Sequence, residues 1–204
     1  MMFNEICQDL ERELYKACVR YLSLLQNDVK NEKVYAFAIL IESGFVSMGI
    51  SVNTIEGLKE RRIKEKSVTP VELITPDIYL EMSSAEWKYQ NKHWDVFVSV
   101  NKVLDTFFEN LYEGNGFVDI DKKLNVDEIM NFAESRFIQI ILNVLKRIKS
   151  DNLLNGSTLL NDLFLGVQFN DIGKEEIVLI EKVSKELNSM YWLDKVLQMK
   201  NLIK

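Results

Sequence analysis

The sequence predicts an α+β fold, in which a small antiparallel sheet built on a hairpin is packed by several amphipathic helices. The chain has 204 residues with only 2 Pro and 8 Gly, so few residues interrupt regular structure. Long segments carry apolar residues at helical spacing, whereas residues 33–52 hold two adjacent runs with strand-like alternation. The length and the even composition predict one globular domain over residues 1–204.

Helices are predicted in both halves of the chain. Apolar residues recur every three or four positions over Asn4–Asn27, Trp94–Tyr112 and Asp127–Lys149, which is the spacing of an amphipathic helix. The tail over Lys174–Lys204 has the same character, with a break expected near Asn188–Ser189. These helices are expected to pack on the sheet.

The predicted hairpin joins two unequal strands. Lys33–Ile41 is apolar on both alternating faces, with Tyr35 and Phe37 on the same side, so this strand is expected at the centre of the sheet. Phe45–Val52 has one apolar face, and its other face is nearly bare at Ser47, Gly49 and Ser51. The second strand is therefore expected near an edge or facing water.

The connections are predicted from local signals. Asn53 with Glu56 three residues later forms a capping box that predicts a helix start. Both prolines fall within Thr69–Met82, which predicts an irregular crossing with a short strand at Ile78–Met82. A further strand is predicted at Leu163–Asp171.

The cysteines and the apolar runs indicate a cytoplasmic protein without a membrane partner. Cys7 and Cys18 lie in one predicted helix, roughly 16 Å apart along its axis, and a disulfide requires Cα atoms within about 7 Å. Both are expected to be reduced and buried. The first residues carry acids where a signal peptide requires a basic region, and the apolar runs are far shorter than a membrane span.

The charge balance argues against nucleic acid as a partner. The formal net charge is -6 and the pI about 5.0, whereas non-specific binding to phosphates requires clustered Lys and Arg. The one basic run, Lys59–Lys66, has acids interleaved at helical spacing. It is interpreted as a solvated helix face.

No catalytic residue, metal site or cofactor is predicted. His93 is the single histidine and is interpreted as a surface or capping residue, while both cysteines lie in a helix, so a Zn site is not expected. A calcium loop starting at Asp119 would need Gly at its sixth position and Glu at its twelfth, but these are Leu124 and Met130. The acids of residues 119–128, Asp121 among them, are interpreted as helix caps that also present a negative patch to a basic partner.

An aromatic cluster gives the remaining site hypothesis. Trp87, Tyr89 and Trp94 fall in an otherwise polar stretch. One interpretation places Trp87 in the core beside the proline-rich crossing, and the other makes the cluster an exposed anchor for a protein partner. Candidate partner-binding residues are therefore Trp87, Tyr89, Asp119 and Asp121.

The order of several motifs carries a family resemblance. "VYAFAILIES", a second strand running into "SVNTIEGL", then "SSAEWKY", and later "LFLGVQFND" with "KELN" resemble a bacterial family of uncharacterised single-domain proteins. Its members are commonly encoded beside secreted polymorphic toxins and are supposed to act as immunity proteins. The resemblance implies a cytosolic protein that binds and neutralises a cognate toxin, and an acidic protein is suited to blocking a basic nuclease.

Three functions are therefore considered. The leading hypothesis is a non-enzymatic, immunity-type binding protein. The first alternative is a hydrolase or small-ligand-binding enzyme with a carboxylate cleft around Asp119–Glu128. The second is a structural subunit of a homo-oligomer, in which the bare face of Phe45–Val52 or an apolar patch pairs with its own copy.

Overall fold

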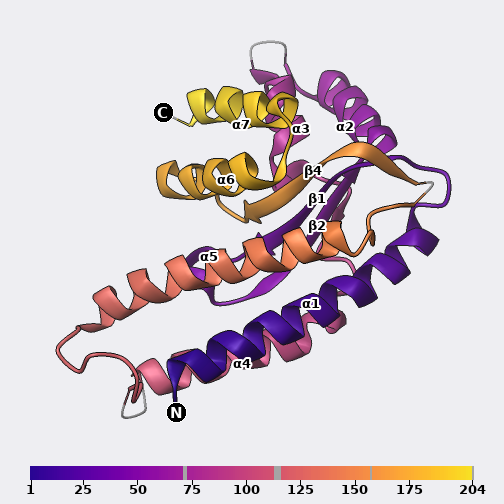
Figure 1. Cartoon of the computed structure of the whole chain (residues 1–204). Coiled ribbons are helices and arrows are strands. Elements are labelled where there is room, and N and C mark those ends of the chain that lie inside the picture. Colours follow the sequence, from indigo (N-terminus) through magenta and orange to yellow (C-terminus); the bar gives the residue numbers. More distant parts are fainter. Residues whose placement is uncertain (71–72, 113–115, 157, 204) are drawn as a thin grey trace.

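The computed structural model describes residues 1–70, 73–112, 116–156 and 158–203 and arranges them in three layers, with a sheet between two groups of helices (Figure 1). The sheet has the strand order β3-β2-β1-β4. Its strands are β1 (Val34–Ile41), β2 (Met48–Thr54), β3 (Tyr89–Gln90) and β4 (Leu159–Phe169). One helical layer holds α1 (Phe3–Asp28), α4 (Val98–Tyr112) and α5 (Val126–Ser150); the other holds α2 (Ile55–Val68), α3 (Asp77–Met82), α6 (Lys174–Leu187) and α7 (Met190–Leu202). The predicted α+β class is confirmed.

The predicted long helices and the hairpin are present. Strands β1 and β2 pair antiparallel, joined through a short 3-10 helix, η1 (Ser43–Phe45), in which Gly44 has a φ of 70°. Strand β4 pairs with β1 in parallel, so the sheet is mixed. A parallel neighbour requires a long crossover, and residues 55–158 provide it.

Strand β1 is central, as predicted, but one of its side chains points to the unexpected face. A register shift at the start of β1 marks a bulge in its pairing with β2, and a bulge reorients the side chains beside it. The Tyr35 hydroxyl donates to the Glu81 carbonyl of α3 over 2.9 Å, and its ring stacks on Trp192 of α7. The Phe37 ring instead meets Tyr21 of α1. The expectation that Tyr35 and Phe37 share a face is wrong because of this bulge.

The second strand lies near an edge of the sheet, as predicted, because its outer neighbour is the two-residue β3, but the expectation that one of its faces meets water is wrong. Every residue of β2 is buried. Two short 3-10 helices, η3 (Ser84–Glu86) and η4 (Trp94–Phe97), flank β3, which pairs with β2 at Ser51 and Val52. At Gly49 the side-chain amide of Asn91 occupies the space that a Cβ atom would need. The face is bare in sequence because the chain itself packs closely against it.

The cap of α2 lies one residue later than the sequence suggests. The Thr54 hydroxyl accepts the backbone N–H of Gly57 over 2.9 Å, so Thr54, not Asn53, is the N-cap. Asn53 is fully buried and its Oδ1 accepts from the Thr54 N–H. The Glu56 carboxylate accepts the backbone N–H of Lys33. The Asn53 carboxamide is engaged in the core, where its Nδ2 donates to the Tyr35 hydroxyl. It is therefore not free to cap the helix, and the strand runs on through Asn53.

The proline-rich crossing contains a helix where a strand was predicted. Residues 78–82 belong to α3, which begins directly after Pro76, and its Leu80 and Met82 are buried. Proline restricts the residue before it, but Pro76 is the N-cap of α3, where its missing N–H costs no helical hydrogen bond. The predicted strand at Ile78–Met82 is therefore wrong. Part of the predicted crossing, residues 71–72, lies outside the described residues.

The remaining predictions about the elements hold. The tail breaks at Asn188–Ser189 between α6 and α7, and the predicted fourth strand begins at Leu159, earlier than expected. Cys7 and Cys18 are both buried and unpaired. No helix in the described part of the chain is both long and apolar enough to cross a bilayer.

Candidate functional site

Trp87 and Tyr89, two of the predicted partner-binding residues, are buried. The Trp87 side chain is 4% exposed, its indole N–H donates to the Glu81 carbonyl over 3.0 Å, and its ring meets the edge of Phe164. Tyr89 is 8% exposed and its hydroxyl donates to Glu32 over 2.9 Å. The interpretation of Trp87 as a core residue is confirmed. The expected exposed anchor is wrong for both, and their partner-binding role stays a prediction.

Tyr89 belongs to a satisfied polar cluster at the end of α1. Burial, and then the Glu32 carboxylate, raise the pKa of Tyr89 to about 12. Burial alone would raise the pKa of Glu32, but hydrogen bonds from Lys88, Thr54 and Tyr89 lower it. Nearby, His93 precedes η4 with a φ of 57°, and its Nε2 lies 2.6 Å from an Asp28 oxygen. These contacts join η4 to α1.

Asp119 caps a helix that lies far from it in sequence. Its two carboxylate oxygens accept the backbone N–H groups of Phe3 and Asn4, over 2.6 and 2.9 Å. Burial would raise the pKa of Asp119, but these donors and the nearby N-terminus lower it below its ordinary value. A carboxylate at a helix N-terminus satisfies free donors and complements the dipole. The predicted capping role is confirmed, and the capped helix is α1.

The following acids form local caps on an exposed loop. The Asp121 side chain accepts the backbone N–H of Lys123 over 3.0 Å. Asn125 and Glu128 form a reciprocal capping box at the start of α5. Residues 121–128 are all exposed. The carboxylates of this stretch therefore lie on a solvated surface instead of inside the cleft that the enzyme alternative requires.

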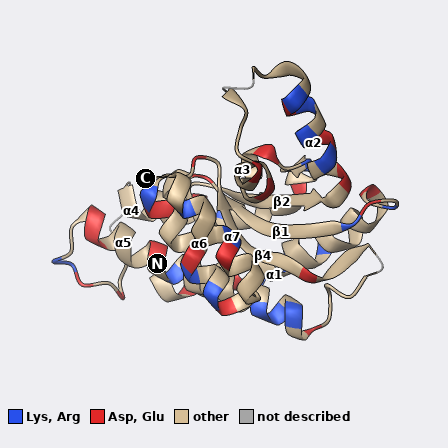
Figure 2. Ribbon diagram, turned by 90° about the horizontal axis from the view of Figure 1, so that it is seen from above, with Lys and Arg blue, Asp and Glu red and all other residues tan. Residues whose placement is uncertain are grey.

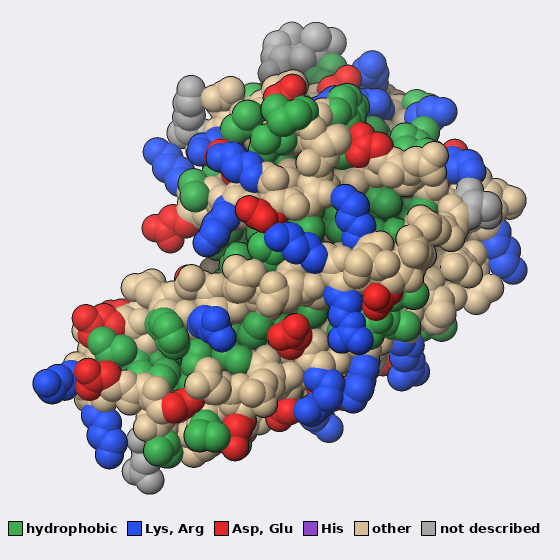
Figure 3. Space-filling model, viewed as in Figure 1, with side chains coloured by type: hydrophobic (Ala, Val, Ile, Leu, Met, Phe, Trp, Pro, Cys, Tyr) green, Lys and Arg blue, Asp and Glu red, His purple; other side chains and the backbone are tan. Residues whose placement is uncertain are grey.

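The end of the α1–α4–α5 layer carries an exposed apolar and acidic surface, which we call the tip surface: residues 1–5, 109–112 and 116–132. Its exposed apolar side chains are Met1, Met2, Tyr112, Val118, Leu124, Val126 and Phe132. Two contacts make it continuous, because Val118 N–H donates to the Met1 carbonyl and the Phe132 ring packs on Phe3. Figure 3 shows hydrophobic and acidic side chains gathered at this end.

The tip surface is predominantly acidic. Its charged side chains are Glu5, Glu109, Asp119, Asp121, Asp127 and Glu128 against Lys122 and Lys123, all of them exposed. The 116–125 loop that carries several of them projects from the helices (Figure 2). An exposed apolar patch with a surplus of one charge is typical of a protein–protein contact surface.

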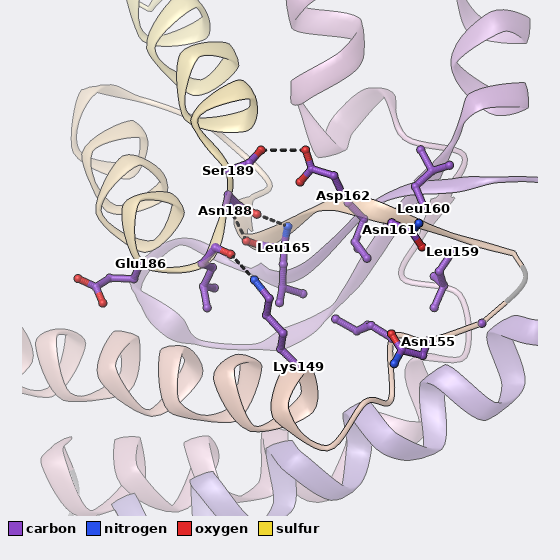
Figure 4. A pocket seen from close by; sticks show the side chains of 14 residues that line it. Lys149, Asn155, Leu159, Leu160, Asn161, Asp162, Leu165, Glu186, Asn188 and Ser189 are labelled. Atoms are coloured by element: carbon purple, nitrogen blue, oxygen red, sulfur yellow. Dashed lines mark hydrogen bonds between the residues drawn. The ribbon is translucent and has the colours of Figure 1, made fainter.

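A second feature is a pocket of about 700 Å³ beside β4, which we call the β4 cleft (Figure 4). Strand β4 forms its back wall, the α6–α7 turn and the end of α5 border it, and residues 154–156 close it. The lining residues are Lys149, Leu154, Asn155, Gly156, Leu159, Leu160, Asn161, Asp162, Leu163, Leu165, Glu186, Leu187, Asn188 and Ser189. Leucines and amide side chains therefore dominate its wall.

The hydrogen bonds of the β4 cleft fix its walls. The Asn188 carboxamide accepts from the Leu165 N–H and donates to the Leu165 carbonyl, each over 2.8 Å. The Lys149 ammonium donates to the Leu187 carbonyl over 3.0 Å. The Ser189 hydroxyl donates to one Asp162 oxygen over 2.9 Å. Nothing in the sequence pattern brings these residues together, so the cleft was not predicted.

Two arginines of the basic run on α2, Arg61 and Arg62, form internal ion pairs, whereas its lysines are exposed. Arg61 contacts Glu65 and Glu86 over 2.8 and 2.5 Å, and blue and red residues alternate along this helix in Figure 2. Hydrogen bonds from Thr75, and then Arg61, lower the pKa of Glu65 to about 2. These arginines serve the packing of α2, in line with the interpretation as a helix face.

The described residues form a three-layer α+β protein with an exposed apolar and acidic surface at one end and a cleft beside β4. Residues 14–188 match the family described as Domain of unknown function (DUF4303), and the chain belongs to this family. No curated protein and no solved structure matches the chain significantly.

Proposed function

We propose that this protein is a non-enzymatic binding protein of the immunity type, which binds and neutralises a cognate toxin through the tip surface. The observation that supports this proposal is the union of exposed apolar side chains with a surplus of carboxylates at one end of the molecule. Val118 and Tyr112, with exposed fractions of 76% and 63%, give contact area. The toxin as partner rests on the family resemblance of the sequence motifs.

The chemistry of the tip surface selects a basic protein surface as the partner. Six carboxylates against two lysines attract a positively charged face and accelerate its association. The apolar side chains then supply the area that excludes water once the surfaces meet. Asp119 contributes indirectly, because its hydrogen bonds to α1 hold the loop against residues 3 and 4.

The alternatives receive less support from the described residues. The enzyme alternative needs carboxylates in a cleft, whereas those of residues 121–128 are exposed. The homo-oligomer alternative requires an exposed face on the second strand, whereas every residue of β2 is buried. Self-association through the tip surface is an outcome that the following experiment distinguishes.

The test starts with affinity capture from the native host and an assay of whether the captured protein is toxic when expressed alone. Val118→Asp in the tip surface is compared with Ile63→Asp, because Ile63 on α2 is 70% exposed and provides a matched apolar control. Asp121→Lys is compared with Asp171→Lys, an exposed acid elsewhere. The tip variants are expected to lose neutralisation while the controls retain it.

The association rate gives a second measure. Asp121→Lys is expected to slow association at low salt by several-fold, with the difference shrinking at higher salt because ions screen exposed charges. Capture of no toxic protein, or equal neutralisation by the tip variants and their controls, would refute the proposal. A concentration-dependent dimer that Val118→Asp abolishes would favour the oligomer instead.

A further inference from the structure

Asparagine side chains guard the sheet at two places where a strand has no neighbouring strand on one side, namely the start of β2 beyond the short β3 and one position of β4. On the β2 side, the Asn101 carboxamide accepts from the Met48 N–H and donates to the Met48 carbonyl, over 2.8 and 3.2 Å. On the β4 side, Asn188 does the same for Leu165. Each amide takes the place of one residue of a neighbouring strand, which is a way of blocking an exposed edge.

Along the β4 cleft, no asparagine guards the first half of β4 among the described residues. The side-chain bond to its backbone there comes from the Trp192 indole N–H, which donates to the Asp162 carbonyl over 3.2 Å. In the register with β1, Val34 pairs with Leu159 but Ala36 pairs with Phe164, so residues 160–163 bulge out of the ladder. Strand β4 is last in the sheet order, and Leu159–Leu163 line the cleft. A bulged edge beside a pocket is a recurrent position for a binding site.

Of the charged side chains that line the β4 cleft, one carboxylate is available to pair with a cationic ligand. Glu186 is paired with Lys146 over 2.8 Å, and Lys149 is bonded to the Leu187 carbonyl. Asp162 accepts from Ser189 through one oxygen, and it has no cationic partner in the part of the chain that the structure describes. Figure 4 shows Asp162 on the side of the cleft opposite Lys149.

We propose that the β4 cleft binds an extended peptide segment of a partner protein, which adds a short strand along β4 at residues 159–163 and pairs with backbone groups other than the Asp162 carbonyl, which Trp192 already occupies. The segment carries a basic side chain that pairs with Asp162 and aliphatic side chains that pack on the leucines of the wall. The edge segment is roughly 16 Å long at the rise of a strand, and recognition by strand addition uses backbone hydrogen bonds with pockets for alternate side chains.

The shape of the cleft favours a single peptide over a second copy of this chain. The strand edge is recessed between the α6–α7 turn and residues 154–156, which all line the cleft. In a second copy of the chain, β4 would lie in an identical cleft. The segments that border the two clefts would therefore meet before the two strand edges could pair. A lone extended segment has no such walls.

In the experiment, a displayed library of random peptides is selected for binding to the intact protein. Wild type is expected to enrich peptides that alternate aliphatic residues with Lys or Arg. Asp162→Asn is expected to weaken the best peptide about tenfold, because a charge-assisted hydrogen bond becomes a neutral one, whereas Asp171→Asn should leave its affinity unchanged. The Asn side chain still accepts from Ser189, so the wall should persist.

Backbone pairing is tested with the selected peptide methylated on alternate backbone nitrogens. The peptide methylated at the nitrogens that face β4 is expected to lose binding, and the unmethylated peptide is expected to slow hydrogen exchange at residues 159–163. Enrichment of no peptide, equal binding of both methylated series, or equal affinity of Asp162→Asn and wild type would overturn the proposal. None of these outcomes depends on the tip surface.

Discussion

The Asn188 carboxamide forms two hydrogen bonds with the backbone of Leu165, both 2.8 Å long. Asn188 is the residue at which α6 ends, and its Nδ2 also donates to the Ser184 hydroxyl over 3.1 Å. One side chain therefore closes the edge of β4 and fixes the turn into α7. Because buried backbone groups need partners, this amide has a structural role that an apolar side chain cannot fill.

Replacing this amide should destabilise the protein. Asn188→Ala leaves two backbone groups of Leu165 without a partner, so the free energy of unfolding should fall by about 2–3 kcal/mol. Urea denaturation measures the change. Asn201→Ala is the control, because Asn201 is exposed on α7 and has no side-chain hydrogen bond among the described residues. Equal stability of the two variants would contradict the role of Asn188.

Removing the cap of α1 should loosen its first turn. Asp119→Ala removes both acceptors for the N–H groups of Phe3 and Asn4, and loss of an N-cap costs about 1–2 kcal/mol. Hydrogen exchange at residues 3–6 should accelerate, and the midpoint of urea denaturation should decrease. Asp121→Ala is the matched control, since its carboxylate accepts only within its own loop. A larger loss for the control than for Asp119→Ala would count against the cap.

The Tyr35 hydroxyl should contribute measurably to stability. It donates to the Glu81 carbonyl and accepts from Asn53 Nδ2, over 2.9 and 2.8 Å, in a buried site. Tyr35→Phe leaves the Asn53 amide short of an acceptor, so the free energy of unfolding should fall by about 1–2 kcal/mol. Tyr191→Phe serves as control because that ring is 54% exposed. Thermal melting of both variants checks the difference, and a neutral Tyr35→Phe would show that Asn53 finds another partner.

Glu65 should make stability depend on pH in the acid range. Its pKa is lowered from 4.5 to about 2, so the unfolded chain binds a proton more readily than the folded protein between these values. The stabilisation is complete above pH 4.5 and is lost as the pH falls towards 2. The stability difference between wild type and Glu65→Gln should therefore shrink from pH 6 to pH 2.5 in urea denaturation. Glu11→Gln, at an exposed position with no partner among the described residues, should show no such trend.

The sequence was most informative where the signal is local. Apolar spacing located the helix that became α5 within a residue at either end, and the Asn125–Glu128 box starts it as a capping box should. The pattern of β1 showed that both faces are covered. It could not show the bulge that turns Tyr35 to the other face, because a bulge depends on the pairing partner.

The candidate site was only partly predictable for the same reason. The acids of residues 119–128 were recognised as caps, but the helix that Asp119 serves begins more than a hundred residues earlier. Trp87 and Tyr89 lie in a polar stretch of sequence but are buried by contacts with distant elements. Trp87 bonds to the backbone of α3 and Tyr89 to the backbone of α1. The β4 cleft joins the ends of α5 and α6 with β4, and no single segment of sequence carries that arrangement.

The sequence by itself determined the fold class, the order of the main helices, the hairpin and the acidic character of the protein. These follow from side-chain periodicity, from turn residues and from net charge, which all act over short stretches of chain. The tertiary structure alone decided the parallel pairing of β4, the burial of the second strand, the continuity of the tip surface and the existence of the β4 cleft. Each of these depends on contacts between distant segments, whose free energy is realised only when the layers pack together.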